Sequence, residues 1–395
     1  MTRKRDASRP NPHGAAAGHD IIVIGTSTGG VEALISIVRD LPPNLPAAVF
    51  VVLHLSPQSP SHLPDILARN GDIPAVHPHD GEPIQHGRIY VAPPDFHMLV
   101  EEGRVRVVRG PRENRHRPAV DPLFQTAAVA YGSHVIGVVL TGALDDGTAG
   151  LHAVKERGGI AIVQDPNDAL ISSMPANAMN YAAVDYILPL ALMGTKLAQL
   201  VHEPAPDEQK RPISAQLKFE SNMVRMDEAT MQSEVRPGRL SAFTCPACKG
   251  PLWELRDGEL LHCRCRVGHS FTGESMLVGQ SEYVDEALWA AYNTLNESAI
   301  IAQRLAQDSR TQGHTSIADR FEERARLQRS RAHILHGVLE GSDHTIPVND
   351  QAAPRSLPEV QGVQMEGEER NWPRAVIRVP DLQALALHLS RCEGG

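Results

Sequence analysis

Cysteine is absent from the first 244 residues of this 395-residue sequence, and four of its five cysteines lie between Cys245 and Cys265. This clustering favours one local metal site in a reducing compartment over a disulfide framework. The sequence also lacks an apolar run long enough to span a membrane, and its basic start leads into proline, histidine and glycine instead of the apolar core of a signal peptide. We therefore expect a cytoplasmic protein without membrane insertion.

The sequence has no excess of basic charge, since its formal net charge is −9. Proteins that bind nucleic acid usually present a basic field, so we expect no nucleic-acid partner. Aromatic residues make up only 4% of the sequence and 30 prolines are present, which indicates that part of the chain is not packed. Hydrophobic residues still reach 42%, enough for a core, and the length suggests two or three domains.

From residue 19 to 203, apolar strands alternate with amphipathic helices, a pattern typical of a doubly wound α/β fold with a mostly parallel sheet. Two short strand-like runs at 98–100 and 105–108 flank a Glu-Glu-Gly-Arg turn and predict an antiparallel hairpin.

The first strand of this region runs through Ile24 into a glycine-rich turn that ends at Gly30, and helical spacing follows. Ser27 lies at the apex of Gly25-x-Ser27-x-Gly29, a pattern in which small neighbours allow a strained turn to present a serine hydroxyl. The free N–H groups at the start of the next helix could hold an oxyanion or a phosphate. The pentapeptide alone therefore leaves a nucleophile and an anion-binding loop as equal alternatives.

Ser27, His54 and Asp146 each follow a strand that we predict to be parallel, and the C-terminal ends of parallel strands lie at one edge of the sheet. Together they supply a nucleophile, a general base and a carboxylate that orients the base. Each also has a simpler interpretation, because Ser27 and Asp146 could cap helices and His54 is one of 19 histidines. Their joint placement favours a hydrolase triad, although the order Ser, His, Asp disfavours the ordinary α/β-hydrolase fold.

Cys245-x-x-Cys248 and Cys265-x-x-x-His269 have the spacing of two zinc knuckles. A small hairpin module lacks a core of its own and would use a structural zinc for folding energy. Cys263 is a rival fourth ligand, but a Cys-x-Cys step is tighter than the usual spacing, and unligated cysteines are the simpler alternative. Two stretches with helical spacing follow and predict an antiparallel helix pair, which could also join two copies of the chain.

The predicted fold is therefore a doubly wound α/β domain with an antiparallel hairpin, followed by a small zinc ribbon and a helical hairpin. The predicted boundaries are a disordered leader (1–18), the α/β catalytic domain (19–203), a linker (204–240), the zinc ribbon (241–273), the helical hairpin (274–341) and a mostly disordered tail (342–395).

Six blocks of the α/β region resemble the signature of the bacterial chemotaxis protein-glutamate methylesterase (CheB) catalytic domain, in that family's order. They are Ile24–Gly30, Leu53–Leu55, Tyr90–Pro93, His116–Asp121, Leu140–Gly147 and Met174–Pro175. The resemblance implies that Ser27 is the nucleophile, His54 the base and Asp146 the third member, preferred over Asp145 because it directly precedes the glycine. It also implies hydrolysis of glutamyl methyl esters on chemoreceptor cytoplasmic helices with release of methanol, and leaves open whether receptor glutamines are deamidated.

The resemblance further implies an oxyanion hole formed by backbone N–H groups, which we place at Thr28 and Ala143, and a reaction without a catalytic cofactor. Ala143 stands where the family commonly has methionine, which puts the shape of the pocket in question more than the chemistry. The family's familiar form carries an N-terminal receiver domain, and this catalytic strand begins within about 20 residues of the start. We therefore expect no receiver control in cis. The alternative is a non-catalytic sensory adaptor, with an anion-binding glycine-rich loop and C-terminal modules that recruit partners.

Overall fold

The computed structural model describes residues 18–58, 60–206, 212–233, 235–257 and 260–341. The predicted leader, apart from Gly18, and the predicted tail lie outside these residues. Among the helices of the described segments, none is both long and apolar enough to cross a membrane.

A seven-stranded sheet forms the centre of the α/β domain, and every pair of neighbouring strands in it is parallel. Its strands are, in spatial order, β3 (Ala75–Val76), β4 (Arg88–Val91), β2 (Ala48–Leu53), β1 (Ile21–Thr26), β7 (Val135–Val139), β8 (Ile160–Gln164) and β9 (Tyr186–Leu188). The order reverses on either side of β1, so the topological switch point lies between β1 and β7. In doubly wound sheets this is where sites form, at the C-terminal ends of the strands.

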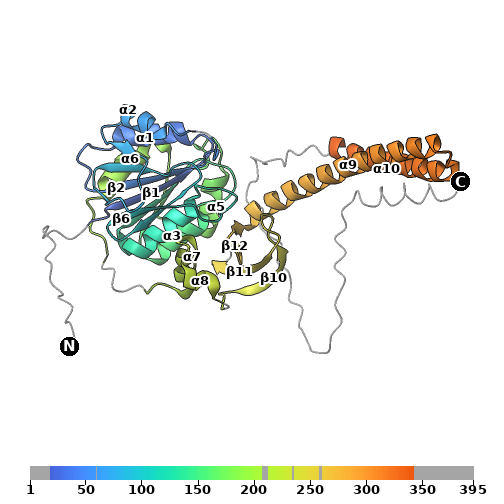
Figure 1. Ribbon diagram of the computed structural model, residues 1–395. Coiled ribbons are helices and arrows are strands. Elements are labelled where there is room, and N and C mark those ends of the chain that lie inside the picture. Colours follow the sequence, from blue (N-terminus) through green and yellow to red (C-terminus); the bar gives the residue numbers. More distant parts are fainter. Residues whose placement is uncertain (1–17, 59, 207–211, 234, 258–259, 342–395) are drawn as a thin grey trace, which may run out of the picture. The chain divides into compact units, whose positions relative to one another are not determined.

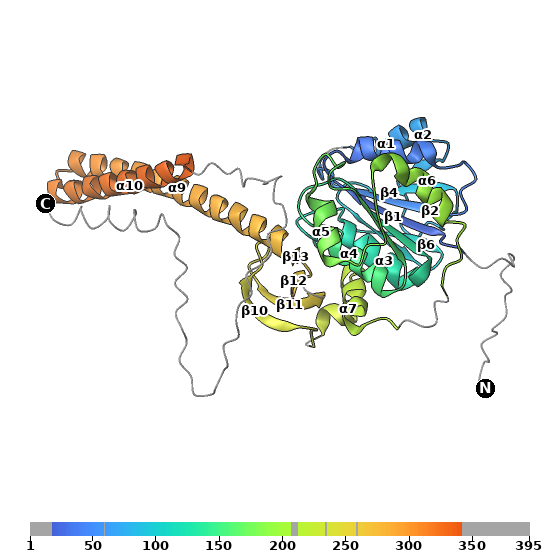
Figure 2. The same cartoon turned by 180° about the vertical axis from the view of Figure 1, so that it is seen from behind.

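Helices cover both faces of the sheet, as Figures 1 and 2 show. The side chains of β1 alternate between two cores, with Ile21 and Val23 in one and Ile22 and Ile24 in the other. This alternation follows from the two-residue period of a strand, and it explains why the strand is apolar throughout. The core of Ile22 is covered by α1 (Gly30–Asp40), α2 (Leu63–Asn70) and α6 (Leu190–Leu200), and that of Ile21 by α3 (Val120–Tyr131), α4 (Thr148–Glu156) and α5 (Ser173–Tyr181).

The predicted antiparallel hairpin is formed by β5 (His97–Glu101) and β6 (Arg104–Val108), which pair outside the main sheet. The hairpin packs on α3, where the Val100 N–H donates to the Thr126 hydroxyl at 3.1 Å. A single 3-10 turn, η1 (Gly132–His134), leads from α3 into β7. The mostly parallel α/β fold with one antiparallel hairpin is thus confirmed.

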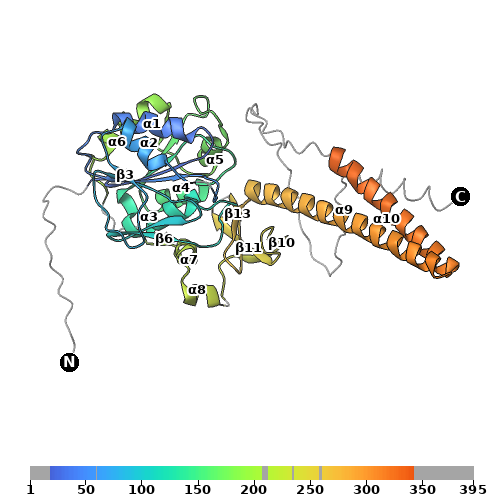
Figure 3. The same cartoon turned by 45° about the horizontal axis from the view of Figure 1, so that its top comes forward.

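After the α/β domain, a four-stranded antiparallel sheet is made of β10 (Arg239–Thr244), β11 (Pro251–Asp257), β12 (Leu260–Cys265) and β13 (Ser270–Thr272). Two long helices, α9 (Gly273–Thr311) and α10 (Thr315–Gly341), then lie side by side (Figure 3). Gly313 has φ +81° between them, a left-handed conformation that glycine adopts readily. Association of two chains through these helices stays a prediction.

The segment 204–240 differs from the linker that its polar composition predicts. It contains α7 (Ala215–Val224) and α8 (Glu228–Gln232), and Leu217 of α7 is buried in the core beneath α3. Both helices begin with a side-chain cap, since Ser214 accepts a hydrogen bond from the Leu217 N–H and Asp227 from the Thr230 N–H. These capping residues were the local signal in the sequence from which the two helices could have been predicted. Both helices are too short to show a clear apolar period, and α7 is stabilised by the packing of its buried residues.

Candidate active site

The loop between β1 and α1 places Ser27 at the C-terminal edge of the sheet. The Ser27 N–H donates to the Thr141 carbonyl, at the end of β7, at 3.0 Å. Gly142 packs so closely that a Cβ there would lie 2.8 Å from the Ser27 Cβ, and Gly29 turns the chain into the helix with φ +79°. The serine is therefore held between the two central strands of the sheet, by contacts that only glycine allows.

His54 follows β2, and its backbone N–H continues the ladder by donating to the Thr26 carbonyl at 3.2 Å. Its ring lies against Asp146 from the β7–α4 loop, with 2.7 Å between Nε2 and Asp146 Oδ2. Only 6% of the His54 side chain and 2% of the Asp146 side chain is exposed, so the pair is shielded from water. This arrangement fixes the imidazole and stabilises a positive charge on it.

Nδ1 of His54 is buried and has no hydrogen-bond partner in the described part of the chain. Nor does a hydrogen bond join Ser27 to His54 among those residues, although both follow neighbouring strands. The structure therefore joins the predicted base to the predicted carboxylate directly and places the predicted nucleophile at the same sheet edge. Catalytic hydrogen bonds are often loose without substrate and tighten in the bound complex.

Asp146 is a strong acceptor site, with the Val120 N–H donating to Oδ2 at 2.7 Å and the Asn114 side chain to Oδ1 at 2.9 Å. Burial raises the pKa of Asp146, but the hydrogen bond and charge of His54, together with these donors, bring that pKa below its ordinary value. The carboxylate therefore stays ionised. Its neighbour Asp145 accepts from the Thr272 hydroxyl at 2.5 Å instead of contacting His54, and burial raises the pKa of Asp145 to about 7.

Sequence reasoning assigned no role to His116, whose ring stacks on that of His54. The ring centroids are 3.7 Å apart and the planes differ by 5°. Burial, followed by the charge of His54, lowers the pKa of His116 to about 3, so this ring stays neutral at physiological pH. A neutral aromatic face can hold the base in place without competing for its proton. His116 belongs to the block His116–Asp121, so the motif could be found in the sequence, but its contact with His54 could not.

Asp121, in the same block, was also missed as a structural part of the site. Its Oδ1 accepts from the Gly147 N–H at 3.0 Å and the Gly150 N–H at 2.6 Å, which ties the start of α3 to the start of α4. Burial and then the charge of Asp146 raise the pKa of Asp121. These contacts fix the loop that carries Asp146.

The two N–H groups predicted for the oxyanion hole come from Thr28, directly after Ser27, and Ala143, directly after Gly142. In the part of the chain that the structure describes, neither N–H has a backbone acceptor. The Thr28 carbonyl is fixed by the Thr141 hydroxyl at 3.0 Å, and Leu144 with φ +64° turns the chain after Ala143. Their place in an oxyanion hole stays a prediction.

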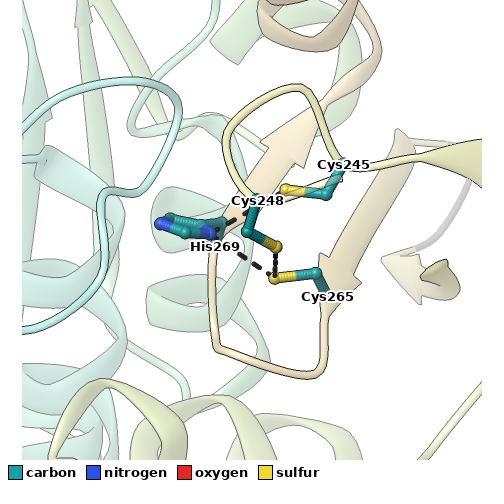
Figure 4. Close-up of side chains that lie close together, drawn as sticks. All are labelled: Cys245, Cys248, Cys265 and His269. Atoms are coloured by element: carbon teal, nitrogen blue, oxygen red, sulfur yellow. Dashed lines mark hydrogen bonds between the residues drawn. The ribbon is translucent and has the colours of Figure 1, made fainter. Parts of the chain in front are cut away.

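A second cluster unites the four predicted metal ligands, Cys245, Cys248, Cys265 and His269 (Figure 4). Their ligand atoms all lie within 4.8 Å of one another, with 3.6 Å between the sulfurs of Cys248 and Cys265 and 3.6 Å from the Cys265 sulfur to His269 Nδ1. Tetrahedral zinc with Zn–S bonds of about 2.3 Å separates its sulfur ligands by about 3.8 Å. The donor set therefore fits zinc.

The rival ligand Cys263 lies outside this cluster. It is two residues before Cys265 on β12, opposite Glu254 and Phe271. The ligand atoms that lie within 4.8 Å of one another come from Cys245, Cys248, Cys265 and His269, and the Cys263 sulfur is not among them. Cys263 is buried in the small core of the ribbon, where its side chain packs as an apolar residue.

Comparison with known proteins shows what the α/β domain is similar to. The model of the CheB methylesterase family matches residues 22–197. A Leptospira interrogans protein, provisionally named protein-glutamate methylesterase/protein-glutamine glutaminase, is 39% identical over 183 residues, which cover 46% of this chain and 93% of that protein. The protein-glutamate methylesterase/protein-glutamine glutaminase 1 of Rhodospirillum rubrum is 39% identical over 179 residues, 43% of this chain and 46% of that protein. The crystal structure of the Thermotoga maritima CheB methylesterase catalytic domain is 36% identical, covers 46% of this chain and 98% of that chain, and has a TM-score of 0.44.

These matches define the class of protein, which is an enzyme that hydrolyses carboxylic esters. The chain belongs to the CheB methylesterase family. The family match ends at residue 197, so the metal-ligand cluster and the helices α7 to α10 lie beyond it. The chain spans about half the length of the Rhodospirillum rubrum relative.

Proposed function

We propose that this chain is a serine esterase that demethylates glutamyl methyl esters on methyl-accepting chemoreceptors and so acts in chemotactic signal transduction. The observation that carries the proposal is the buried 2.7 Å contact between His54 and Asp146 at the sheet edge where Ser27 lies. The relatives' names supply the substrate class, a methylated protein glutamate. Their second named activity suggests that receptor glutamines are also substrates.

In the proposed mechanism the Ser27 hydroxyl attacks the ester carbonyl while Nδ1 of His54, the nitrogen not bound to Asp146, takes its proton. Asp146 holds Nε2–H and stabilises the imidazolium. The tetrahedral intermediate collapses, and the methoxide leaves as methanol with the proton from His54. Water then attacks the acyl-enzyme by the same steps in reverse and releases glutamate and free Ser27. With a glutamine substrate, ammonia would leave in place of methanol.

The oxyanion of each tetrahedral intermediate is proposed to accept hydrogen bonds from the N–H groups of Thr28 and Ala143. Both donors belong to the backbone, so the change from the family's common methionine to Ala143 alters the pocket wall and not the donor. Loss of one such donor typically costs about 10²- to 10³-fold in turnover. The site itself uses no metal in this mechanism.

A fluorophosphonate probe tests the proposed function directly, because it phosphorylates an activated serine and marks its position. The wild-type chain should be labelled at Ser27 and should release methanol from a methylated receptor helix. Labelling should be lost on heat denaturation, which removes the triad geometry. A folded chain that is neither labelled nor releases methanol would favour the non-catalytic adaptor that binds an anion in the Gly25–Gly30 loop.

We further propose that Cys245, Cys248, Cys265 and His269 hold one structural zinc. When bound, zinc would link the β10–β11 end of the ribbon to the β12–β13 end, and would supply folding energy that a small antiparallel sheet lacks.

Metal analysis should find one zinc per chain, and Cys265→Ser should release it because a tetrahedral site loses one of four ligands. Cys263→Ser is the matched control and should leave the zinc content unchanged, since that sulfur is not among the four clustered ligand atoms. Loss of metal from the Cys263 variant and retention in the Cys265 variant would reverse the ligand assignment.

A further inference from the structure

The turn between β6 and α3 presents one buried amide, that of Asn114, to both the active site and the C-terminal module. We define this module as β10–β13 with α9 and α10. Glu113 and His116 exchange backbone hydrogen bonds of 3.1 and 2.8 Å across the turn. Asn114 and Arg115 between them have φ +48° and +71°, the pattern of a type I′ turn, in which asparagine is favoured at the first position. The turn therefore sets the direction in which the Asn114 side chain leaves the backbone.

The nitrogen end of this side chain faces two carboxylates. Nδ2 donates to Asp146 Oδ1 at 2.9 Å and to Asp121 Oδ2 at 2.8 Å. Apart from Asn114, Oδ1 of Asp146 receives only the longer 3.3 Å hydrogen bond from the Asp121 N–H among the described residues. Asn114 is thus the principal anchor of the Asp146 oxygen that does not contact His54.

The oxygen end of the same amide faces the start of α9. Oδ1 accepts from the Thr272 N–H at 3.0 Å and from the Ser275 hydroxyl at 3.1 Å. Thr272 and Ser275 form the capping box that begins the helix. An asparagine amide offers two donors and two acceptor positions, and all four are used here in a site that is 2% exposed. Because two acceptors lie at one end and two donors at the other, the amide has only one satisfactory orientation.

Further contacts hold the module against this turn. The Asn114 N–H donates to the Ser270 carbonyl at 2.9 Å, and the Thr272 hydroxyl to Asp145. Buried Arg264 of β12 pairs with Glu113, beside Asn114, at 2.8 Å, and with Glu220 of α7 at 3.0 Å. The module is therefore docked on the residues that directly precede and contact the triad carboxylate.

We propose that Asn114 is a positioning residue through which the docked C-terminal module fixes the Asp146 carboxylate, so that the module is a working part of the esterase site. The proposal rests on the proposed function, since it assigns Asp146 to the triad. The chemistry stays with Ser27, His54 and Asp146. Asn114 acts through Asp146, and Ser275 acts through Asn114.

The test uses full-length protein, with a small ester as substrate and fluorophosphonate titration to count active sites. Asn114→Ala should lower kcat per titrated site about 10- to 100-fold, as expected when a carboxylate loses a hydrogen bond, with little change in KM. Ser275→Ala should lower it about 2- to 10-fold, as expected for a neutral hydrogen bond. In the double variant, Ser275→Ala should add almost nothing, because its effect passes through Asn114. Ser281→Ala, whose hydroxyl donates to the Leu277 carbonyl within α9, is the matched control and should behave as wild type.

Counting sites separates positioning from folding, because a purely structural residue would lower the number of titrated sites and leave kcat per site unchanged. That result, or additive effects of the two substitutions, would overturn the proposal. The proposal would also be overturned if Ser275→Ala had the same kcat per site as wild type. This variant tests the proposal even if Asn114→Ala does not fold. Failure of wild-type protein to take up the probe would instead refute the proposed function, so the two failures are distinguishable.

Discussion

Ser27→Ala and His54→Ala should each lower ester turnover by a factor on the order of 10³ or more, and the double variant should be little worse than either single variant. The physical reason is that the two residues perform one proton transfer. Ser27 is a weak nucleophile unless its proton moves to His54, and His54 has no proton to take once the hydroxyl is gone. The measurement is methanol release from a methylated receptor helix, with kcat and KM determined separately.

Two controls match these variants in chemistry but replace residues outside the proposed triad. Ser36→Ala replaces a serine within α1, and His62→Ala a histidine whose side chain is 75% exposed. Both should keep wild-type turnover. Losses that multiply in the double variant, or equal losses in the controls, would contradict a shared proton transfer between Ser27 and His54.

The sequence was sufficient to predict the α/β domain, and the two groups of candidate site residues could be named from it, for a physical reason. Each element of a parallel sheet is buried on both faces, so its apolar run is visible without knowledge of its neighbours. Ser27, His54 and Asp146 follow such runs, and the sheet then brings their positions to one edge. The candidate metal ligands were equally visible, because each pair of them is separated by only a few residues.

The contacts around the triad could not be predicted in the same way. His116 stacks on His54 from a loop 62 residues further on, and Asn114 reaches both Asp146 and α9. No periodicity marks residues that act through a turn conformation and buried hydrogen bonds. For the same reason, 204–240 looked like a linker, and the catalytic domain and the module looked separable. The residues that join them, Glu113, Glu220 and Arg264, are far apart in the sequence and individually unremarkable.

Arg264→Met should destabilise the docked module by about 3–5 kcal/mol, the usual cost of removing one partner from a buried ion pair. The Arg264 guanidinium donates to both Glu113 and Glu220, and all three side chains are at most 3% exposed. Without the cation, two carboxylates would remain in a site that water hardly reaches. Arg239→Met is the matched control, because its side chain is 73% exposed and its pair with Glu254 should contribute less than about 1 kcal/mol.

The distribution of tryptophan allows the module to be observed separately from the catalytic domain, since the chain's tryptophans are absent from the first 252 residues. Denaturant unfolding followed by tryptophan fluorescence should therefore report the module, while esterase activity in the same samples reports the catalytic domain. In Arg264→Met the fluorescence transition should move to lower denaturant concentration, and activity should fall with it if docking fixes Asp146.

Adding Glu113→Gln and Glu220→Gln should restore much of the lost stability, because neutral amides remove the buried charges that the substitution leaves uncompensated. Unchanged fluorescence in the Arg264 variant would show that the ion pairs do not hold the module, whereas an early fluorescence transition with full activity would show that the site works without docking.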